Sequence, residues 1–493
     1  MDESGHRVRD VRICPARAGE ARKNARMTTS ISAVRTTGIY CRAGCSARPL
    51  SRNVTRYATS IAAEAAGFRP CLRCRPDRLP PSVPGDTEAL VGRALLLIAD
   101  GALDETSEDA LAGRLGVTAR HLRRLFHERV GATPSFVARS RRAHFARRLL
   151  DETDLRMVDV ALTAGFSTVR QMNREMQIVF RFTPTELRAK RLRADRLVAD
   201  GGIRLRVPYA GALAFDDLLD YLRPRALPGV EVVDGPTYRR TITVCGEAGA
   251  IEVSQAVDGQ HLLVVAHLPT IGALIDDVAR CRRLFGLDRP AAEETTLAGD
   301  PLLAGLIRAR PGVRVPGAWD PFETSVRVLL GQQVSVAGAT TLAGRLVEAF
   351  GTPVAGLGEM GLTHTFPAAT QIVAASIERL RGIGLPEARA RALREFALAY
   401  AEERVHLDAA APYEVTMESL LALPGIGPWT AQMIALRACG QPDAFASGDL
   451  GLRRKAARLR GEAEPMAAEA LEALAEQWRP HRALAAMHLW LAS

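Results

Sequence analysis

The sequence lacks the long apolar runs of membrane proteins and contains almost no lysine. No stretch approaches the roughly 18 consecutive apolar residues that span a bilayer, and residues 1–30 are Arg-rich without an apolar leader. We therefore expect neither a membrane protein nor an exported one, and we predict a cytoplasmic protein. The only lysines are Lys23, Lys190 and Lys455, so a mechanism that needs a Schiff-base lysine has few candidates.

The composition is that of a soluble globular chain with several domains. A chain of 493 residues is too long for one hydrophobic core. The net charge of +10 comes from the first two hundred residues, and the remainder is slightly acidic. A basic half suits DNA as a partner, although an excess of charge alone equally fits a solvated surface.

Changes in the residue pattern predict a multidomain α+β protein. Prolines and a glycine after Leu79 indicate a linker. Runs such as Thr241–Cys245 and His261–Val265 favour strands, whereas the pattern from Pro321 onward is helical. The predicted divisions are a divergent N-terminus or one with a misplaced start codon (1–30), a small zinc domain with four cysteine ligands (31–79), a linker (80–86), an all-α double helix-turn-helix domain (87–196), an α+β subdomain (203–290) and an all-α helix-hairpin-helix lobe (291–493).

Four cysteines have the spacing of a metal site. They form two pairs, Cys41-x3-Cys45 and Cys71-x2-Cys74, and such pairs in a reducing compartment indicate metal binding rather than disulfides. Four thiolates favour tetrahedral Zn²⁺. By spacing alone, a purely structural zinc site is the commoner explanation.

The residues around these cysteines resemble the methyl-acceptor domain of the Ada adaptive-response regulators. The matching runs are Ala33–Arg42 and Ala66–Cys74. In that family the first cysteine takes a methyl group from a methylphosphotriester in DNA, so the resemblance implies that Cys41 is both acceptor and zinc ligand. The other three would be ligands only. Residues 1–30, which include Cys14, depart from the opening strand of that family.

Two helical segments repeat the same pattern, and both are similar to AraC-type regulators. Ala112–Phe126 and Ala161–Arg174 each contain a small residue, a glycine at a turn and a basic second helix. A single basic helix is most often a solvated face, but two matched copies favour DNA binding. Candidate contacts to bases or phosphates, which the sequence does not sort, are Arg120, Arg123, Arg124, Arg170, Gln171 and Arg174.

Leu423–Ala431 predicts a helix-hairpin-helix turn. Its two glycines would let backbone N–H groups approach a DNA phosphate without sequence preference. A plain connection between helices is the alternative. We expect DNA contacts from Pro424, Gly425, Ile426 and Gly427, and a monovalent cation at the turn is a further candidate.

Residues 203–493 resemble AlkA-type methyladenine glycosylases of the helix-hairpin-helix superfamily. The runs Asp320–Glu323 and Leu330–Val336 carry the match together with the hairpin. The resemblance implies that Asp449 is the essential aspartate, although most lone aspartates are only helix caps. A carboxylate can stabilise an oxocarbenium-like sugar and activate water. A purine alkylated on a ring nitrogen is already cationic and leaves without protonation, so no second, acidic carboxyl group is needed.

The same resemblance implies a pocket for a flipped base. Electron-rich aromatics can hold a cationic ring by stacking, and the family positions correspond to Trp429, Trp490, Tyr221 and Met433. A buried aromatic is more often a core residue, and for Tyr221 a core role is the open alternative. Gln333 takes the place of the wedge leucine. Trp429 stands where bifunctional relatives have their lysine, so we predict no strand-cutting lyase activity.

We predict a bifunctional alkylation-response protein. A glycosylase of the DNA-3-methyladenine glycosylase II type, which releases 3-methyladenine and 7-methylguanine type bases, would be fused to a methylation-responsive transcriptional activator. Expected partners are alkylated and promoter double-stranded DNA and RNA polymerase, with no organic cofactor. Without a Pro-Cys-His-Arg run, no alkylguanine transfer is expected. Alternatives are a transcription factor whose lobe only senses damage, and a glycosylase whose N-terminal half is a passive DNA tether.

Overall fold

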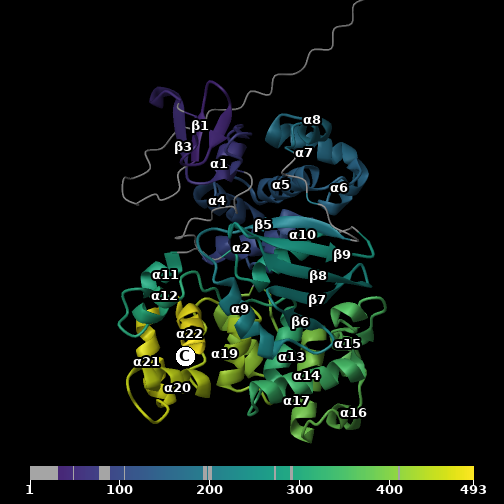
Figure 1. The fold of residues 1–493 in the computed structure, drawn as a ribbon, viewed down its shortest axis with the longest axis vertical. Coiled ribbons are helices and arrows are strands. Elements are labelled where there is room, and N and C mark those ends of the chain that lie inside the picture. The colour runs from purple at the N-terminus through teal and green to yellow at the C-terminus, as the bar shows by residue number, and fades with distance from the viewer. Residues whose placement is uncertain are drawn as a thin grey trace, which may run out of the picture.

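The computed structural model shows several domains stacked along one axis (Figure 1). A small sheet and a helical domain form one end, a larger sheet crosses the middle, and a helical lobe forms the other end. The predicted N-terminal segment, Cys14 and the predicted linker lie outside the described residues. Those described are 31–47, 49–76, 89–104, 106–192, 197, 202–270, 274–288, 292–408 and 411–492.

The first domain is a four-stranded sheet with strand order β3-β1-β2-β4. Its strands pair antiparallel except for β2 and β4, which are parallel. Cys41 ends β2, and the amide of Cys71, directly after β4, donates to the carbonyl of Tyr40 at 3.0 Å. The parallel pairing therefore places the two cysteine pairs side by side. The elements are β1 (Ile31–Val34), β2 (Ile39–Cys41), η1 (Ser51–Asn53), β3 (Val54–Tyr57), α1 (Ser60–Ala65) and β4 (Arg69–Pro70).

The second domain consists of two helix-turn-helix pairs around a long central helix. Threonine side chains cap both second helices: Thr118 accepts from the amide of His121, and Thr168 from that of Gln171. Gly116 and Gly165 have φ of +71° and +77° at the two turns, a region that glycine adopts at no cost. The helices are α2 (Ala89–Ala99), α3 (Glu108–Arg114), α4 (Ala119–Arg129), α5 (Pro134–Glu152), α6 (Met157–Thr163), α7 (Val169–Phe180) and α8 (Pro184–Ala189).

The middle of the molecule is an antiparallel sheet of strand order β5-β9-β8-β7-β6. The predicted strand runs fall in β7 and β9, where alternating residues such as Ile242, Val264 and Ala266 are buried. The elements are β5 (Ile203–Pro208), α9 (Phe215–Leu222), η4 (Arg223–Arg225), β6 (Glu231–Asp234), β7 (Thr237–Val244), β8 (Glu247–Gln255), β9 (His261–His267) and α10 (Leu274–Leu284).

The C-terminal lobe is helical apart from one small strand pair, β10 (Thr352–Pro353) and β11 (His364–Thr365), which the sequence pattern did not predict. No described helix combines the length and apolar character needed to cross a membrane. The helices are α11 (Ala292–Leu297), α12 (Ala304–Ala309), α13 (Pro321–Leu330), α14 (Val336–Phe350), η5 (Gly358–Met360), α15 (Ala369–Ala374), α16 (Ile377–Gly382), α17 (Glu387–Ala401), α18 (Tyr413–Leu421), α19 (Pro428–Arg437), α20 (Leu450–Leu459), α21 (Ala468–Ala475), η6 (Glu476–Trp478) and α22 (Arg482–Leu491).

Ion pairs dock the helix-turn-helix domain on the middle sheet. Arg141 of α5 lies 2.7 Å from Asp276 of α10 and 3.1 Å from Asp104. Arg283 binds both carboxylate oxygens of Asp100, at 2.7 and 2.9 Å. The helix-turn-helix domain therefore contacts α10, beside the middle sheet, directly.

One carboxyl group at this junction is poorly solvated. Asp277 on α10 is 5% exposed, and its Oδ2 has no hydrogen-bond partner among the described residues. Burial raises the pKa of Asp277 to about 7, although Arg280, at 3.8 Å, opposes the shift. Asp277 is therefore partly protonated at neutral pH.

Asp277→Asn is expected to stabilise the protein more at high pH than at low pH. The pKa of Asp277 is higher in the folded than in the unfolded protein. At low pH the carboxyl is protonated in both states, so burying it carries no cost of ionisation. As the pH rises, the cost of burying the ionised form grows until the pH passes about 7. The gain in unfolding free energy should be roughly 2 kcal/mol larger at pH 8 than at pH 5. Thermal unfolding at both pH values measures it, and Asp220→Asn, whose side chain is 76% exposed, is the control. Equal gains at the two pH values would contradict this assignment.

Candidate functional site

The hairpin between α18 and α19 requires glycine at one position for two reasons. Gly425 has φ of +80°, and a Cβ built there would lie 2.7 Å from the Cβ of Ala392 on α17. Pro424, Gly425 and Gly427 are exposed, whereas Ile426 is buried against the core. The turn thus presents its backbone to solvent while one side chain anchors it, an arrangement suited to gripping a phosphate.

Asp449 caps α20 and holds its carboxylate in one orientation. Its Oδ1 accepts the amide of Leu452 at 2.9 Å and the indole N–H of Trp490 at 3.2 Å. No described residue donates to Oδ2. The half-buried carboxylate is therefore a helix cap, which was the alternative role considered for a lone aspartate. It also has one oxygen available to a ligand.

Aromatic side chains from three helices gather around this aspartate. Tyr221 of α9 and Trp490 of α22 have ring centroids 6.2 Å apart at 34°. A Cβ at Gly451 would lie 3.0 Å from Asp449 Oδ1 and 3.8 Å from Trp490, which shows how closely α20 approaches the indole. Trp490 packs against two large hydrophobic cores, of which one extends from the helix-turn-helix domain to α22 and the other lies mainly in the C-terminal lobe, so it lies at their junction.

Trp429 approaches the same loop from α19, and Met433 lies on the same helix. A Cβ at Gly448, next to Asp449, would lie 3.8 Å from Cδ1 of Trp429. Met433, one helical turn further on, is 7% exposed. The structure thus gathers four of the predicted pocket and catalytic residues: Asp449, Trp429, Trp490 and Tyr221. Gln333 lies apart from them, exposed on the loop between α13 and α14.

Sequence reasoning missed Arg225. Its guanidinium lies 3.8 Å from the ring centroid of Tyr221, and its Nη1 donates to the carbonyl of Tyr221 at 2.7 Å. This contact occupies one ring face of Tyr221. The four-residue separation of Tyr221 and Arg225 is the feature of the sequence that could have predicted this contact.

Buried ion pairs hold the sheet against the lobe beside Tyr221. Arg240 lies 2.7 Å from Glu323, and Arg327 lies 2.9 Å from Glu231. Burial opposes ionisation of Glu231, but Arg327 and Arg240 outweigh it and lower the pKa of this carboxyl. Arg327 also donates to the carbonyl of Arg225 at 2.5 Å. The charged cluster therefore fixes the backbone that carries the stacked pair.

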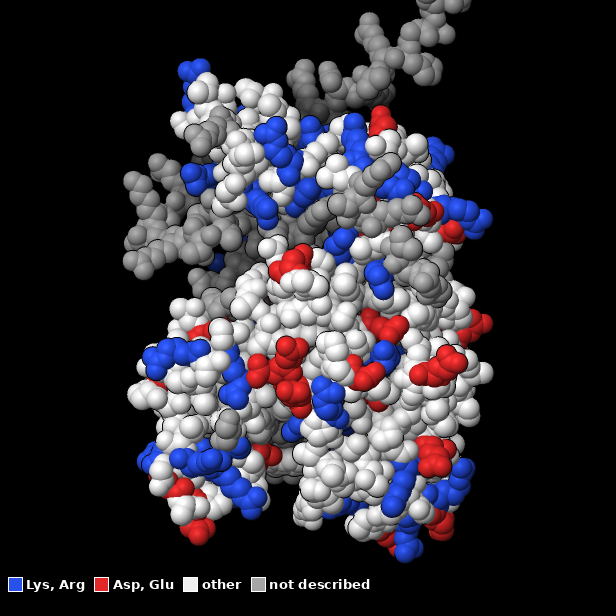
Figure 2. Space-filling view, in the orientation of Figure 1, with Lys and Arg blue, Asp and Glu red and all other residues white. Residues whose placement is uncertain are grey.

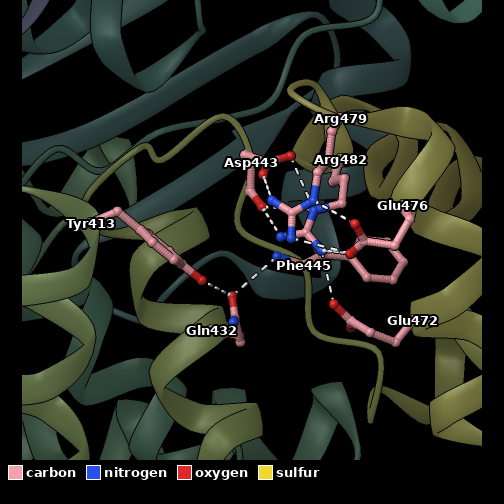
Figure 3. A network of polar contacts seen from close by, with 8 residues as sticks. All are labelled: Tyr413, Gln432, Asp443, Phe445, Glu472, Glu476, Arg479 and Arg482. Atoms are coloured by element: carbon pink, nitrogen blue, oxygen red, sulfur yellow. Dashed lines mark hydrogen bonds and ion pairs between the residues drawn. The ribbon is translucent and has the colours of Figure 1, made fainter. Parts of the chain in front are cut away.

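A polar network supports the loop that leads to Asp449 (Figure 3). Oε1 of Gln432 accepts the hydroxyl of Tyr413 at 2.9 Å and the amide of Phe445 at 3.1 Å. Arg482, which is 3% exposed, binds the side chain and carbonyl of Asp443 at 3.0 Å. The loop after α19 is thus held at Asp443 and Phe445 before it reaches Asp449.

Neither described lysine lies at the pocket. Lys455 hydrogen-bonds to the carbonyl of Ala492, just after α22, and Lys190 lies 5.0 Å from the ring of Phe182 in the helix-turn-helix domain. Lys23 is outside the described residues. In the part of the chain that the structure describes, no amine faces Asp449 for a Schiff base.

The four predicted zinc ligands form one cluster. The sulfur atoms of Cys41, Cys45, Cys71 and Cys74 all lie within 4.8 Å of one another. A tetrahedral site with Zn–S bonds of about 2.3 Å needs similar spacing, so the residues fit the ion. Burial raises the pKa of the Cys74 thiol to about 11, and a bound cation would overcome this resistance to ionisation.

The buried carboxylate of Glu64 joins the cysteine domain to the helix-turn-helix domain. It accepts the hydroxyl of Tyr40 at 2.6 Å, that of Ser140 at 2.6 Å and Nε2 of His144 at 2.7 Å. Burial opposes ionisation of Glu64, but His144, Ser140 and Tyr40 lower its pKa below the ordinary value. Two of these partners belong to α5, and Tyr40 precedes Cys41.

Glu64→Ala is expected to separate the two N-terminal domains. Removing the carboxylate takes a shared acceptor from the buried hydroxyls of Tyr40 and Ser140 and from the partly buried ring of His144, and should cost about 3 kcal/mol. Limited proteolysis should then cleave between the domains at least tenfold faster than in Glu128→Ala, a control whose side chain is 53% exposed. Because the folded pKa is lowered, the wild-type contact should weaken as pH falls through that pKa. Unchanged proteolysis would exclude this role.

The predicted helix-turn-helix contacts differ in their partners. Arg120 and Arg170 are exposed and form no ion pair with described residues. Arg123 pairs with Glu108, Arg124 lies 3.2 Å from His121, and Arg174 lies 2.9 Å from Glu175. The side chain of Gln171 accepts the amide of Ser167 at 3.0 Å. Figure 2 shows basic side chains gathered over this end of the molecule.

Comparison with known families accounts for most of the chain. Residues 14–77 match the metal binding domain of Ada, 111–190 a helix-turn-helix domain, 204–320 the AlkA N-terminal domain and 326–480 the HhH-GPD superfamily of base excision DNA repair proteins. The first match begins ahead of the domain start predicted at residue 31.

Individual relatives cover the same regions. A Mycobacterium tuberculosis protein described as a probable bifunctional transcriptional activator/DNA repair enzyme AlkA is 41% identical over 465 residues, 93% of this chain and 92% of that protein. The DNA-3-methyladenine glycosylase 2 of Escherichia coli is 32% identical over 55% of this chain and 92% of its own length. The structure of a 3-methyladenine DNA-glycosylase from Archaeoglobus fulgidus superposes with a TM-score of 0.51 at 26% identity, over 58% of this chain and 97% of that one.

Proposed function

The chain belongs to the Ada/AlkA fusion family, and from that premise we propose which residues carry out catalysis, base binding and methyl transfer. It is a bifunctional alkylation-response protein, a DNA-3-methyladenine glycosylase fused to a transcriptional regulator. Double-stranded DNA is the partner of both halves. The residue roles that follow are our assignments.

We assign Asp449 as the catalytic carboxylate. Oδ1 is held by Leu452 and Trp490, so Oδ2 can face the sugar and the attacking water without reorienting. As the N-glycosidic bond breaks, its electron pair leaves with the base, and the carboxylate stabilises the positive sugar carbon. Asp449 then accepts a proton from the water that attacks this carbon.

The base would be held by the aromatic residues around Asp449. A flipped, cationic 3-methyladenine or 7-methylguanine is attracted to the faces of Trp429 and Trp490. Tyr221 is 6% exposed and Arg225 covers one of its faces, so it would contact the base less than the two tryptophans do. A cationic base departs neutral, so the pocket needs no general acid.

The hairpin at Pro424–Gly427 would grip the DNA backbone, and we propose a monovalent cation at this turn as well. Trp429 stands where bifunctional relatives have their Schiff-base lysine, which supports hydrolysis alone, without strand cleavage.

The observation that carries the proposed glycosylase mechanism is the carboxylate of Asp449, which is held through Oδ1 alone by Leu452 and Trp490. Chromatographic detection of free methylated bases released from methylated DNA tests it.

We further propose that Cys41 accepts a methyl group from a methylphosphotriester. Cys41, Cys45, Cys71 and Cys74 would hold Zn²⁺, which keeps the thiolates ionised when bound. The Cys41 sulfur would form a bond to the methyl carbon as the carbon–oxygen bond breaks, and the phosphodiester would leave with the electron pair. The product is a neutral thioether, which removes a negative charge that opposes DNA. RNA polymerase is the proposed target of activation.

A further inference from the structure

One side chain connects the predicted wedge loop, Gly331–Ser335, to the hairpin. Nε2 of Gln332 donates to the carbonyl oxygen of Gly425 at 2.8 Å and to the hydroxyl of Thr430 at 2.9 Å. An amide nitrogen carries two hydrogens, so a single group satisfies both acceptors. Gln332 therefore bridges the loop, the hairpin turn and the first turn of α19.

The loop also holds its exposed tip in an unusual conformation. Gln333 has φ of +56°, a left-handed backbone that side chains other than glycine rarely adopt and that persists only when the surroundings enforce it. Its Oε1 lies 3.5 Å from Nη2 of Arg389 on α17. The adjacent Val334 is 39% exposed. The tip thus presents one polar and one apolar side chain.

The groups that Gln332 contacts are themselves fixed. Gly425 lies so close to Ala392 of α17 that no Cβ fits between them, and Thr430 is 3% exposed. Helix α17 therefore contacts the hairpin through Ala392 and the loop tip through Arg389. Loop, hairpin and helix form one assembly in which Gln332 is the direct polar bridge.

We propose that Gln332 is a positioning residue for base flipping, which sets the distance between the tip at 333–334 and the hairpin. The inference rests on the proposed function. Flipping a base breaks its stacking and pairing contacts and leaves a gap in the duplex. If the hairpin binds a phosphate, the loop tip must fill this gap at a fixed distance from that phosphate. An error of about 1 Å in such placement can lower a rate up to about a hundredfold. Gln332 acts here through the tip and the hairpin.

The test uses the full chain and two substitutions at the bridge. Gln332→Met keeps the side-chain length but removes both donated hydrogens, and Thr430→Val removes one acceptor. The probe is a duplex with one 7-methylguanine beside a 2-aminopurine, whose fluorescence rises when its stack opens. Gln332→Met should lower the fluorescence amplitude and the single-turnover release rate roughly tenfold. Gln332→Met should lower the melting temperature by a few degrees at most, so that the protein stays folded at the assay temperature, and its affinity for undamaged duplex should equal that of the wild type.

The double variant and one control make the assignment specific. The losses of Gln332→Met and Thr430→Val should be less than additive, because both remove the same contact. Gln371→Met, which breaks a glutamine hydrogen bond to Ala368 in the same lobe, should behave as wild type. Wild-type flipping in Gln332→Met, or a loss of flipping that is fully accounted for by unfolded protein at the assay temperature, overturns the inference alone. A wild-type protein that releases no base overturns the proposed function as well.

Discussion

Asp449→Asn is expected to release methylated bases roughly a thousandfold more slowly than the wild type, with little change in stability. Asparagine caps helices about as well as aspartate, so α20 should remain intact. The amide, however, can neither stabilise the positive sugar nor accept a proton from water, and loss of such a group lowers rates by about two to three orders of magnitude. Single-turnover release of 3-methyladenine and 7-methylguanine, followed by chromatography, measures the effect.

A matched control separates the chemistry from the cap. Asp320 also caps a helix of the lobe, α13, by accepting the amide of Glu323 at 3.0 Å, and Asp320→Asn should keep normal activity. The abasic strand left by the wild type should stay uncut until alkali is added. Normal release by Asp449→Asn would refute the assignment. If neither protein released bases, the lobe would be a damage sensor of the regulator.

Cys41→Ala is expected to abolish methyl uptake, whereas the wild type should take up one methyl group per chain. The sulfur that forms the new bond is absent, and the transfer has no other nucleophile assigned to it. Peptide mass spectrometry after incubation with methylphosphotriester DNA identifies the modified residue. Cys245→Ala, which removes an exposed thiol outside the cluster, should be modified normally at Cys41.

The same variant tests the link to gene activation. Wild-type protein should bind promoter DNA more tightly after methylation, and the gain should shrink at higher salt because it is electrostatic. Cys41→Ala should show no such gain. Methyl uptake by Cys41→Ala would show that another residue is the acceptor. A promoter affinity that does not change on methylation would show that the N-terminal half only tethers the protein to DNA.

Several features were predictable because neighbouring residues determine them. The cysteine pairs form a cluster since each pair spans a single turn and the intervening segment forms a compact sheet. Gly425 marks the hairpin because only glycine suits that backbone. The capped second helices of both helix-turn-helix pairs follow from Thr118 and Thr168. The strand pair β10–β11 escaped prediction because two residues per strand carry no periodicity.

The sequence by itself indicated the domain families, the cysteine cluster, the hairpin and the candidate aspartate, because these depend on residue types at short spacing and on runs of residues that resemble known families. Only the tertiary structure decided that Trp490 orients Asp449, that Arg225 covers Tyr221, that Glu64 joins two domains and that Gln332 bridges the wedge loop to the hairpin. Nearly all of these contacts join residues far apart in the chain. They depend on how helices and sheets pack, which local propensity and periodicity do not specify.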